Sequence, residues 1–135
     1  GASKVLNREE FIASTRLPLT KKEFHGAIDT VGGEILSSIV ARLEYGGTIA
    51  VCGNVAGPHF KTTVFPFILR SNRLIGIDSA ECSIDQKKLI WQNYNSVWKL
   101  NSLNEFVREV DLANLMPEFQ KILNGDQIGR ILVKI

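Results

Sequence analysis

The feature that most constrains the fold is a strand, a helix and a second strand in direct succession, separated by paired glycines. Ala27–Val31 is a β-rich apolar run that Gly32-Gly33 ends, and the apolar residues of Glu34–Tyr45 share one helical face. Gly46-Gly47 then stops the helix, as a left-handed C-cap would, before the apolar strand Thr48–Cys52. This succession predicts a parallel sheet covered on both faces, with right-handed crossovers between its strands.

The rest of the chain continues the alternation of strands and helices, which predicts the α/β class with a parallel sheet. Further strands are predicted at Val5-Leu6, Leu74–Asp78, Phe106–Val110 and Ile131–Ile135. Further helical segments are predicted at Glu9–Ala13, Val64–Arg70 and Ile84–Leu100, and a last helix begins near Pro117 and ends at Gly125.

Composition and charge narrow the possible functions. A length of 135 residues with 44% hydrophobic residues suits one compact domain. The 16 Lys and Arg residues against 14 Asp and Glu give a net charge of +2, and no basic run exceeds two residues, so we expect no nucleic-acid partner. No stretch approaches the ~20 apolar residues of a membrane span, and the start shows no signal peptide. With Cys52 and Cys82 interpreted as reduced thiols, we expect a cytoplasmic protein that contacts no membrane.

Small residues follow each predicted strand of the sheet at its carboxyl end, namely Gly32-Gly33, Gly53 and Ser79. In open parallel sheets ligands bind across these ends, where glycine lets a ligand approach the backbone and a following helix favours an anion. The alternative is that these glycines only form turns. Asp29 and Asp78, within or at the ends of strands, are interpreted as aspartates that bind nearby backbone amides.

Motifs of several common chemistries do not occur in the sequence. It contains no G-x-G-x-x-G, no Walker loop, no G-x-S-x-G and no H-E-x-x-H. His25 and His59 are isolated, without a partner at metal-ligand spacing, so we expect no metal site.

Several segments stand in the order and spacing of one family. They are Gly1-Ala2-Ser3, Gly26–Gly32, Tyr45-Gly46-Gly47, Pro66–Arg70, Leu74–Ser79, and Gly129-Arg130 with Leu132–Lys134. The chain thereby resembles the NADPH-dependent quinone-oxidoreductase-like branch of the medium-chain dehydrogenase/reductase superfamily, which contains bacterial acryloyl-CoA reductase. The resemblance spans essentially all 135 residues, and its main length difference falls in the loop around Thr15–Glu23. Pro66–Arg70 and Gly76–Ser79 are typical of this branch rather than of Rossmann proteins in general.

The resemblance implies the later part of a longer protein. Whole members look like a GroES-like catalytic domain, a six-stranded Rossmann domain and a return to the catalytic domain. By this resemblance, residues 1–102 form a partial NADP-binding Rossmann domain, and residues 103–135 form the returning segment. The implied strands three to six are Lys4–Leu6, Ala27–Val31, Thr48–Cys52 and Leu74–Asp78. The glycine fingerprint and most of the substrate pocket would lie upstream, which agrees with a first residue, Gly1, that is not methionine.

The resemblance also implies which residues contact the cofactor. Arg8 matches a basic residue beside the adenosine end of NADP, where a guanidinium stacks or pairs with phosphate. Gly53 and Asn54 match a turn that passes the nicotinamide, with backbone contact at Asn54 because many relatives carry an apolar residue there. Ile68 and Ser79 match positions that flank the nicotinamide and its ribose. The predicted cofactor-binding residues are Arg8, Gly32, Gly53, Asn54, Ile68, Ser79 and Gly125, although Gly125 replaces an asparagine that contacts the cofactor in some relatives.

The implied activity of the parent protein is NADPH-dependent reduction of an activated carbon–carbon double bond, in an enoyl-CoA thioester or enone, or of a quinone. The chain itself carries no predicted catalytic residue and is expected to be inactive alone. The alternative is a nucleotide-binding or assembly module without chemistry. We expect Gly53→Val to abolish cofactor binding and to leave the fold largely intact. We also expect a homodimer through Leu74–Asp78, with further association through the open edge Ala27–Val31.

Overall fold

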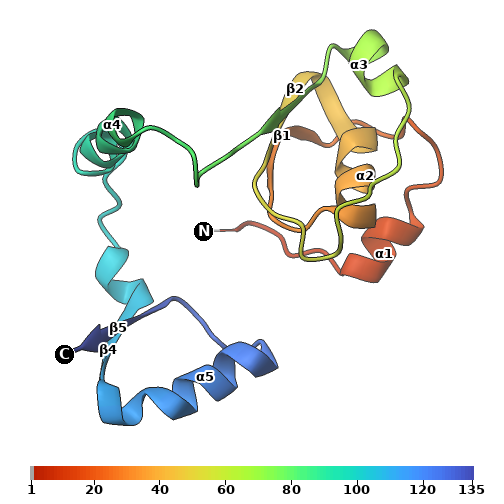
Figure 1. Cartoon of the computed structure of the whole chain (residues 1–135). Helices are drawn as coiled ribbons and strands as arrows, with labels where there is room; N and C mark the ends of the chain where they lie inside the picture. The colour runs from red at the N-terminus through yellow and green to blue at the C-terminus, as the bar shows by residue number, and fades with distance from the viewer. Residues whose placement is uncertain (1) are drawn as a thin grey trace. The chain divides into compact units, whose positions relative to one another are not determined.

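The computed structural model describes residues 2–135, and Gly1, which begins the first matched segment, lies outside the described residues. The chain forms two compact units, Gly1–Cys82 and Ser83–Ile135, and each is described by itself (Figure 1). The elements in chain order are α1 (Arg8–Ala13), β1 (Phe24–Asp29), α2 (Gly33–Arg42), β2 (Leu43–Val51), α3 (Phe65–Arg70), β3 (Arg73–Gly76), α4 (Ile84–Tyr94), η1 (Leu103–Phe106), β4 (Val107–Asp111), η2 (Leu112–Asn114), α5 (Leu115–Asn124) and β5 (Arg130–Lys134). The two sheets, β1-β2-β3 and β4-β5, are parallel, which confirms the predicted α/β class. The assignment of residues 1–102 and 103–135 to two domains of a longer protein stays a prediction.

The core of the first unit lies between α2 and one face of the β1-β2-β3 sheet. Leu36 and Val40 on α2, together with Leu43 and Ile49 on β2, are at most 3% exposed. Full burial of each such side chain stabilises the fold by roughly 1.5–3 kcal/mol. The helix and the central strand therefore form the most stable part of this unit.

The opposite face of this sheet is bare within the first unit, so the expectation of two covered faces is wrong for that unit. Ile28, Ala50 and Ile75 are register partners across the three strands, and the side chains of Ile28 and Ile75 are 79% and 46% exposed. The reason is the strand order β1-β2-β3. Successive right-handed crossovers that advance in one direction across a sheet lie on one face, and Phe67 of α3 indeed packs on the same core as α2.

Helix α2 ends at Arg42, before the predicted end at Tyr45, and Gly46-Gly47 is not its C-cap. The cap residue is Leu43, whose backbone is extended. The paired glycines lie inside β2, where Gly46 has a φ of 72° and the register with β1 shifts. They therefore form an irregularity in a strand, and another group must satisfy the last carbonyls of the helix.

That group is the side chain of Arg70, at the end of α3. Its Nη1 donates to the carbonyls of Ala41 and Leu43 at 3.1 and 2.9 Å, and its Nη2 donates to the Thr20 carbonyl at 2.6 Å. The Thr20 amide in turn donates to the Ala41 carbonyl at 2.9 Å. Because a distant side chain satisfies these carbonyls, the chain passes from α2 directly into β2 without a glycine cap.

A second arginine, Arg42, fixes the segment that precedes β1. It is 8% exposed, and its Nη1 donates to Glu23 Oε2 at 3.0 Å. Its Nε and Nη2 both donate to Thr15 Oγ1, at 3.1 and 3.0 Å, and its guanidinium lies 4.5 Å from the centre of the Phe11 ring. A buried charge needs such partners, and here they come from both ends of residues 11–23.

The predicted strand at Lys4–Leu6 is wrong. A strand needs a paired ladder to satisfy its backbone groups, and no described strand pairs with these residues. The helical turn predicted at Glu9–Ala13 is confirmed as α1. Asn7 caps this helix, because its Oδ1 accepts from the Glu10 amide at 3.1 Å.

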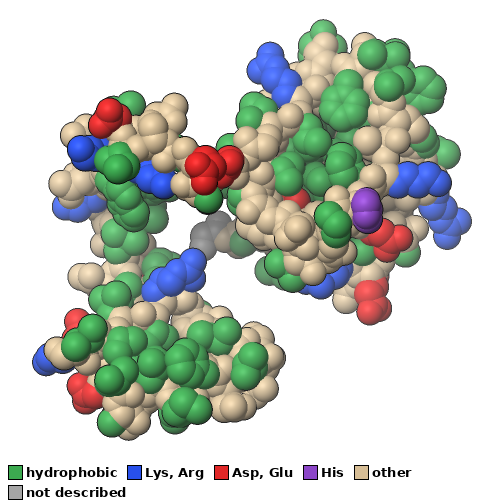
Figure 2. Space-filling model, in the orientation of Figure 1, with side chains coloured by type: hydrophobic (Ala, Val, Ile, Leu, Met, Phe, Trp, Pro, Cys, Tyr) green, Lys and Arg blue, Asp and Glu red, His purple; other side chains and the backbone are tan. Residues whose placement is uncertain are grey.

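The second unit contains the parallel pair β4-β5 and helix α5. Glu118 of α5 is 4% exposed; it pairs with Arg108 of β4 and with Lys121 Nζ at 3.1 Å. Gly125 ends the helix with a φ of 77°, which confirms the predicted helix end. Other apolar side chains of α5, such as Phe119, remain exposed, and Figure 2 shows hydrophobic side chains gathered over this unit.

Helix α4 ends at Tyr94, before the predicted end at Leu100. Ser96 Oγ donates to the Gln92 carbonyl at 2.8 Å, a local bond that competes with continuation of the helix. The Tyr94 ring lies beside Trp91 and Trp98, with centroid distances of 6.0 and 5.6 Å.

Within residues 2–135, no helix is both long enough and apolar enough to cross a membrane.

We expect Arg70→Ala to lower the free energy of unfolding by about 2 to 4 kcal/mol, because it leaves carbonyls near the end of α2 without their charged donor. Urea denaturation followed by circular dichroism measures this change. Arg73→Ala is the matched control, because Arg73 is exposed and its side chain makes no hydrogen bond or ion pair within the described part of the chain. Equal stability of the two variants would contradict the proposed role of Arg70.

Candidate functional site

A pocket of about 350 Å³ lies where the strands of the first sheet end. We call it the strand-end pocket; its lining residues are Gly32, Leu36, Val51, Gly53, Asn54, Gly57, Pro58, Phe60, Leu74 and Gly76. The structure thus brings together three of the residues predicted to contact a cofactor, Gly32, Gly53 and Asn54. The volume lies at the lower end of the range for small-molecule sites.

The turn after β1 forms one side of this pocket. Asp29 is buried, and its carboxylate accepts from the amides of Gly32 at 2.9 Å and Val31 at 3.4 Å. Gly32 has a φ of 70°, in the left-handed region that favours glycine. The prediction that Asp29 binds nearby amides is confirmed, and the same holds for Asp78, whose Oδ1 accepts from Ala80 and Glu81 amides at 3.1 Å.

The turn after β2 packs tightly against the turn after β1. A Cβ added at Gly53 would lie 2.9 Å from the Thr30 carbonyl carbon and 3.0 Å from its Cα. Real Cβ atoms do not approach backbone atoms this closely, so one of the two turns would have to move. The expectation that Gly53→Val leaves the fold largely intact is therefore wrong. The close packing of the two turns requires a glycine at position 53, so this residue has a structural role in the turn.

Two other glycines of the pocket leave open space where a side chain would stand. No heavy atom lies within 4 Å of a Cβ built at Gly57 or Gly76. A ligand can therefore approach the backbone at these positions, which is the property that the sequence assigned to glycines at strand ends. Sequence reasoning did not assign Gly57, Pro58 and Phe60 to the site, although the Gly57-Pro58 turn signal marks this loop.

The chemistry of the strand-end pocket is that of a binding wall. Its lining contains apolar side chains, glycine backbone and the amide of Asn54, with no acidic or basic side chain. Such a surface can orient a flat or apolar group and hydrogen-bond to it through backbone groups. It offers no group for proton transfer.

The remaining predicted residues lie elsewhere. Arg8 lines a separate apolar pocket of about 370 Å³ with Phe11 and Phe24, beside β1. Ile68 is exposed on α3, and Ser79 is exposed beyond the end of β3. Gly125 belongs to the second unit, where its amide donates to the Ile122 carbonyl at 3.1 Å. Their cofactor contacts stay predictions.

A parallel α/β sheet with a glycine-lined pocket at its carboxyl ends is the arrangement of Rossmann-type ligand-binding units. Two curated relatives align along the whole chain. The putative quinone oxidoreductase YhfP of Bacillus subtilis is 39% identical, and the probable acrylyl-CoA reductase AcuI of Escherichia coli is 38% identical. The chain spans 41% of the length of each relative. No protein-family model matches the chain.

Solved structures agree with these relatives. Bacillus subtilis YhfP with NAD bound superposes with a TM-score of 0.89 at 39% identity, covering 100% of this chain and 41% of that one. Escherichia coli YhdH with bound NADPH gives 0.85 at 38% identity, covering 99% and 41%. The resemblance predicted from the sequence is therefore confirmed: the chain is homologous along its length to proteins named as quinone oxidoreductase and acrylyl-CoA reductase.

We expect Gly53→Ala to lower the free energy of unfolding by about 2 to 3 kcal/mol, because the added methyl group forces the turns after β1 and β2 apart. Gly76→Ala is the matched control, since it adds the same group to the same pocket in open space. It should change stability by less than about 0.5 kcal/mol. Thermal and urea unfolding of both variants measure the difference, and similar losses would contradict the packing argument.

Proposed function

We propose that this chain is part of an NADPH-dependent reductase that acts on an activated carbon–carbon double bond, in an acrylyl-CoA-like thioester or an enone, or on a quinone. The observation that carries the proposal is the glycine-lined pocket at the strand ends, in a fold that superposes on YhdH with bound NADPH. YhfP and AcuI, the relatives named above, supply the two substrate classes.

The strand-end pocket fits one part of a dinucleotide, because open space at Gly57 and Gly76 leaves the backbone accessible. When bound, NADPH would supply the hydride. Asn54 and the glycine backbone would orient the cofactor, while Leu36 and Phe60 exclude water from that wall. This wall carries no acidic or basic side chain, so the proton that the developing enolate accepts would come from solvent or from other parts of the enzyme.

The proposal extends to residues outside the strand-end pocket. Arg8 would contact the adenosine end of NADP: it begins α1, is exposed, and makes no ion pair within residues 2–135. Ile68 and Ser79 would flank the nicotinamide and its ribose, and Gly125 would offer only backbone. A cytoplasmic location belongs to the same proposal, and no disulfide joins Cys52 to Cys82.

The test is NADPH oxidation by the longer protein that contains this chain, with acrylyl-CoA or a quinone as acceptor. We expect turnover near the typical ~10 s⁻¹ from the longer protein and none from the 135-residue chain. Turnover by the short chain would contradict the proposal. NADPH binding by the longer protein without reduction of either acceptor would instead favour the nucleotide-binding or assembly module.

In the same assay, Arg8→Ala should weaken the binding of NADPH by about ten- to a hundredfold, and the binding of NADH by less, if Arg8 pairs with the 2′-phosphate. Arg73→Ala, an exposed arginine on β3, serves as the matched control. Equal weakening of both cofactors by Arg8→Ala would place its guanidinium at the adenine or ribose.

We also propose that the segment Leu74–Asp78, which runs from β3 past the end of that strand, pairs with the same segment of a second copy. β3 is an edge of the three-stranded sheet, and Leu74, Ile75 and Ile77 are exposed. The Ile77 amide donates to the Val51 carbonyl at 2.8 Å, so the extended segment continues past the end of β3. An exposed apolar edge of this kind is a template for another strand.

We expect Ile75→Lys to shift the chain from a dimer toward its 15.0 kDa monomer, because a charge at the edge opposes strand pairing. Size-exclusion chromatography with light scattering measures the mass. Ile28→Lys is the control: it places the same charge on β1, the opposite edge, and should remove further association while leaving the dimer. A 15.0 kDa monomer before any substitution would refute this interface.

A further inference from the structure

The loop between β2 and α3 supplies a large part of the strand-end pocket, and we call residues 52–64 the pocket loop. Its members among the lining residues are Gly53, Asn54, Gly57, Pro58 and Phe60. The loop contains no helix or strand, so its position depends on contacts with other elements. The groups that hold the pocket loop therefore also shape the pocket.

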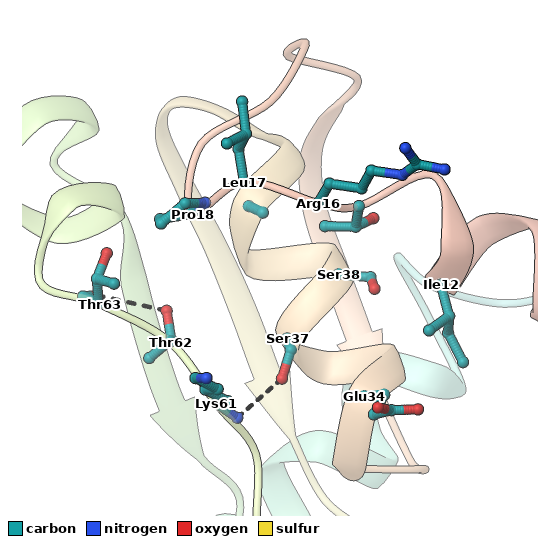
Figure 3. Close-up of a pocket in the computed structure, with 12 residues that line it drawn as sticks. Ile12, Arg16, Leu17, Pro18, Glu34, Ser37, Ser38, Lys61, Thr62 and Thr63 are labelled. Carbon is teal, nitrogen blue, oxygen red and sulfur yellow. Dashed lines mark hydrogen bonds between the residues drawn. The ribbon is translucent and has the colours of Figure 1, made fainter.

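The far end of the pocket loop is attached to α2. The Lys61 amide donates to Ser37 Oγ at 2.9 Å, and Figure 3 draws this bond as a dashed line between the loop and the helix. The Ser37 hydroxyl in turn donates to the Gly33 carbonyl at 3.3 Å. Phe60, next to Lys61, packs against the core of the first unit. The far end is therefore held by α2 and the core.

The near end of the pocket loop, residues 54–57, lies against the turn after β1. The Ala56 amide donates to the Val31 carbonyl at 2.8 Å. A Cβ added at Gly32 would lie 2.7 Å from the Gly57 carbonyl oxygen. The two segments are in direct backbone contact, so a change in the Gly32 backbone must move the near end of the loop.

One buried carboxylate holds the turn after β1. Asp29 is 2% exposed; its Oδ2 accepts from the Gly32 amide at 2.9 Å and its Oδ1 accepts from the Val31 amide at 3.4 Å. The Asp29 backbone carbonyl also accepts from the Cys52 amide at 2.9 Å, where the pocket loop begins. Because a buried carboxylate is costly without hydrogen bonds, the two amides of the turn stay fixed to its two oxygens. Asp29 thereby fixes the residues against which the near end of the pocket loop lies.

We propose that Asp29 is a positioning residue for cofactor binding. Its carboxylate fixes Gly32, Gly32 fixes residues 54–57, and those residues present the backbone against which NADPH would lie. Asp29 is not among the lining residues of the pocket, so it acts through the turn and not by contact with the cofactor. This inference rests on the proposed function and deepens it, because it names the residue that sets the cofactor affinity of the strand-end pocket.

Asp29→Asn tests this role, because it keeps the shape of the side chain but offers one oxygen where the carboxylate offers two. The amide NH₂ group of the new side chain faces one of the two backbone N–H groups, so one of the two bonds is lost. In the longer protein that contains this chain, we expect the dissociation constant for NADPH to rise about five- to tenfold. The kcat at saturating NADPH should change by less than about twofold, as it does when uniform binding is lost.

Val40→Ala is the matched control for stability. Val40 lies on α2 in the core, is 1% exposed and does not line the strand-end pocket. Its truncation lowers the free energy of unfolding and should leave the NADPH affinity of the folded protein unchanged. An equal loss of affinity in Val40→Ala and Asp29→Asn would assign Asp29 to stability alone and overturn its positioning role.

A second measurement needs no cofactor. Amide hydrogen exchange of the 135-residue chain, followed by nuclear magnetic resonance, reports the near end of the loop at Ala56 and the far end at Lys61. Asp29→Asn should speed the exchange of the Ala56 amide about tenfold and leave the Lys61 amide unchanged. Ser37→Ala should have the reverse effect, and Val40→Ala should leave the ratio of the two rates unchanged.

The two measurements separate this inference from the proposed function. An Ala56 exchange rate or an NADPH dissociation constant that Asp29→Asn leaves unchanged overturns the proposal. Failure of the unsubstituted longer protein to bind NADPH contradicts the proposed function instead, and exchange at Ala56 then still decides whether Asp29 positions the pocket loop. Asp29→Ser, whose smaller side chain keeps one oxygen acceptor, repeats both measurements if Asp29→Asn fails to fold.

Discussion

The structure of the first unit depends on which group donates hydrogen bonds to the backbone carbonyls at the end of α2. Arg70 donates to the carbonyls of Ala41, Leu43 and Thr20, so one side chain from α3 joins a helix end, a strand start and a loop. Because these bonds replace a glycine cap, the extended backbone begins at Leu43, which is buried in the core. The register with β1 shifts after Leu43, and from Thr48 onward β2 pairs in continuous register with both β1 and β3, which aligns the three strand ends.

The aligned strand ends explain why the same glycines serve both folding and binding. Gly53 lies against the backbone of Thr30, and Gly32 has a left-handed backbone that the Asp29 carboxylate stabilises. Both glycines also line the strand-end pocket. The two interpretations of these glycines, as turn residues and as ligand contacts, are therefore compatible.

Local patterns predicted the parts of the fold that depend on neighbouring residues. The apolar stripe of α2, the amide-binding aspartates at positions 29 and 78, and the left-handed Gly125 all rest on interactions within a few residues. The failures involve distant partners. The end of α2 depends on Arg70, which lies 29 residues after Ala41, and the tight contact at Gly53 depends on Thr30, on another turn.

The sequence by itself determined the α/β class, the parallel sheet, the order of its elements and the resemblance to quinone oxidoreductase and acrylyl-CoA reductase proteins, because these follow from local periodicity and motif order. Only the tertiary structure decided which predicted residues share a pocket: it joined Gly32, Gly53 and Asn54 but left Arg8 beside β1 and Gly125 in the other unit. It also decided that one face of the first unit's sheet is bare and that Arg70 of α3 satisfies the carbonyls at the end of α2. Such features arise from packing between segments far apart in the chain, and no local pattern encodes them.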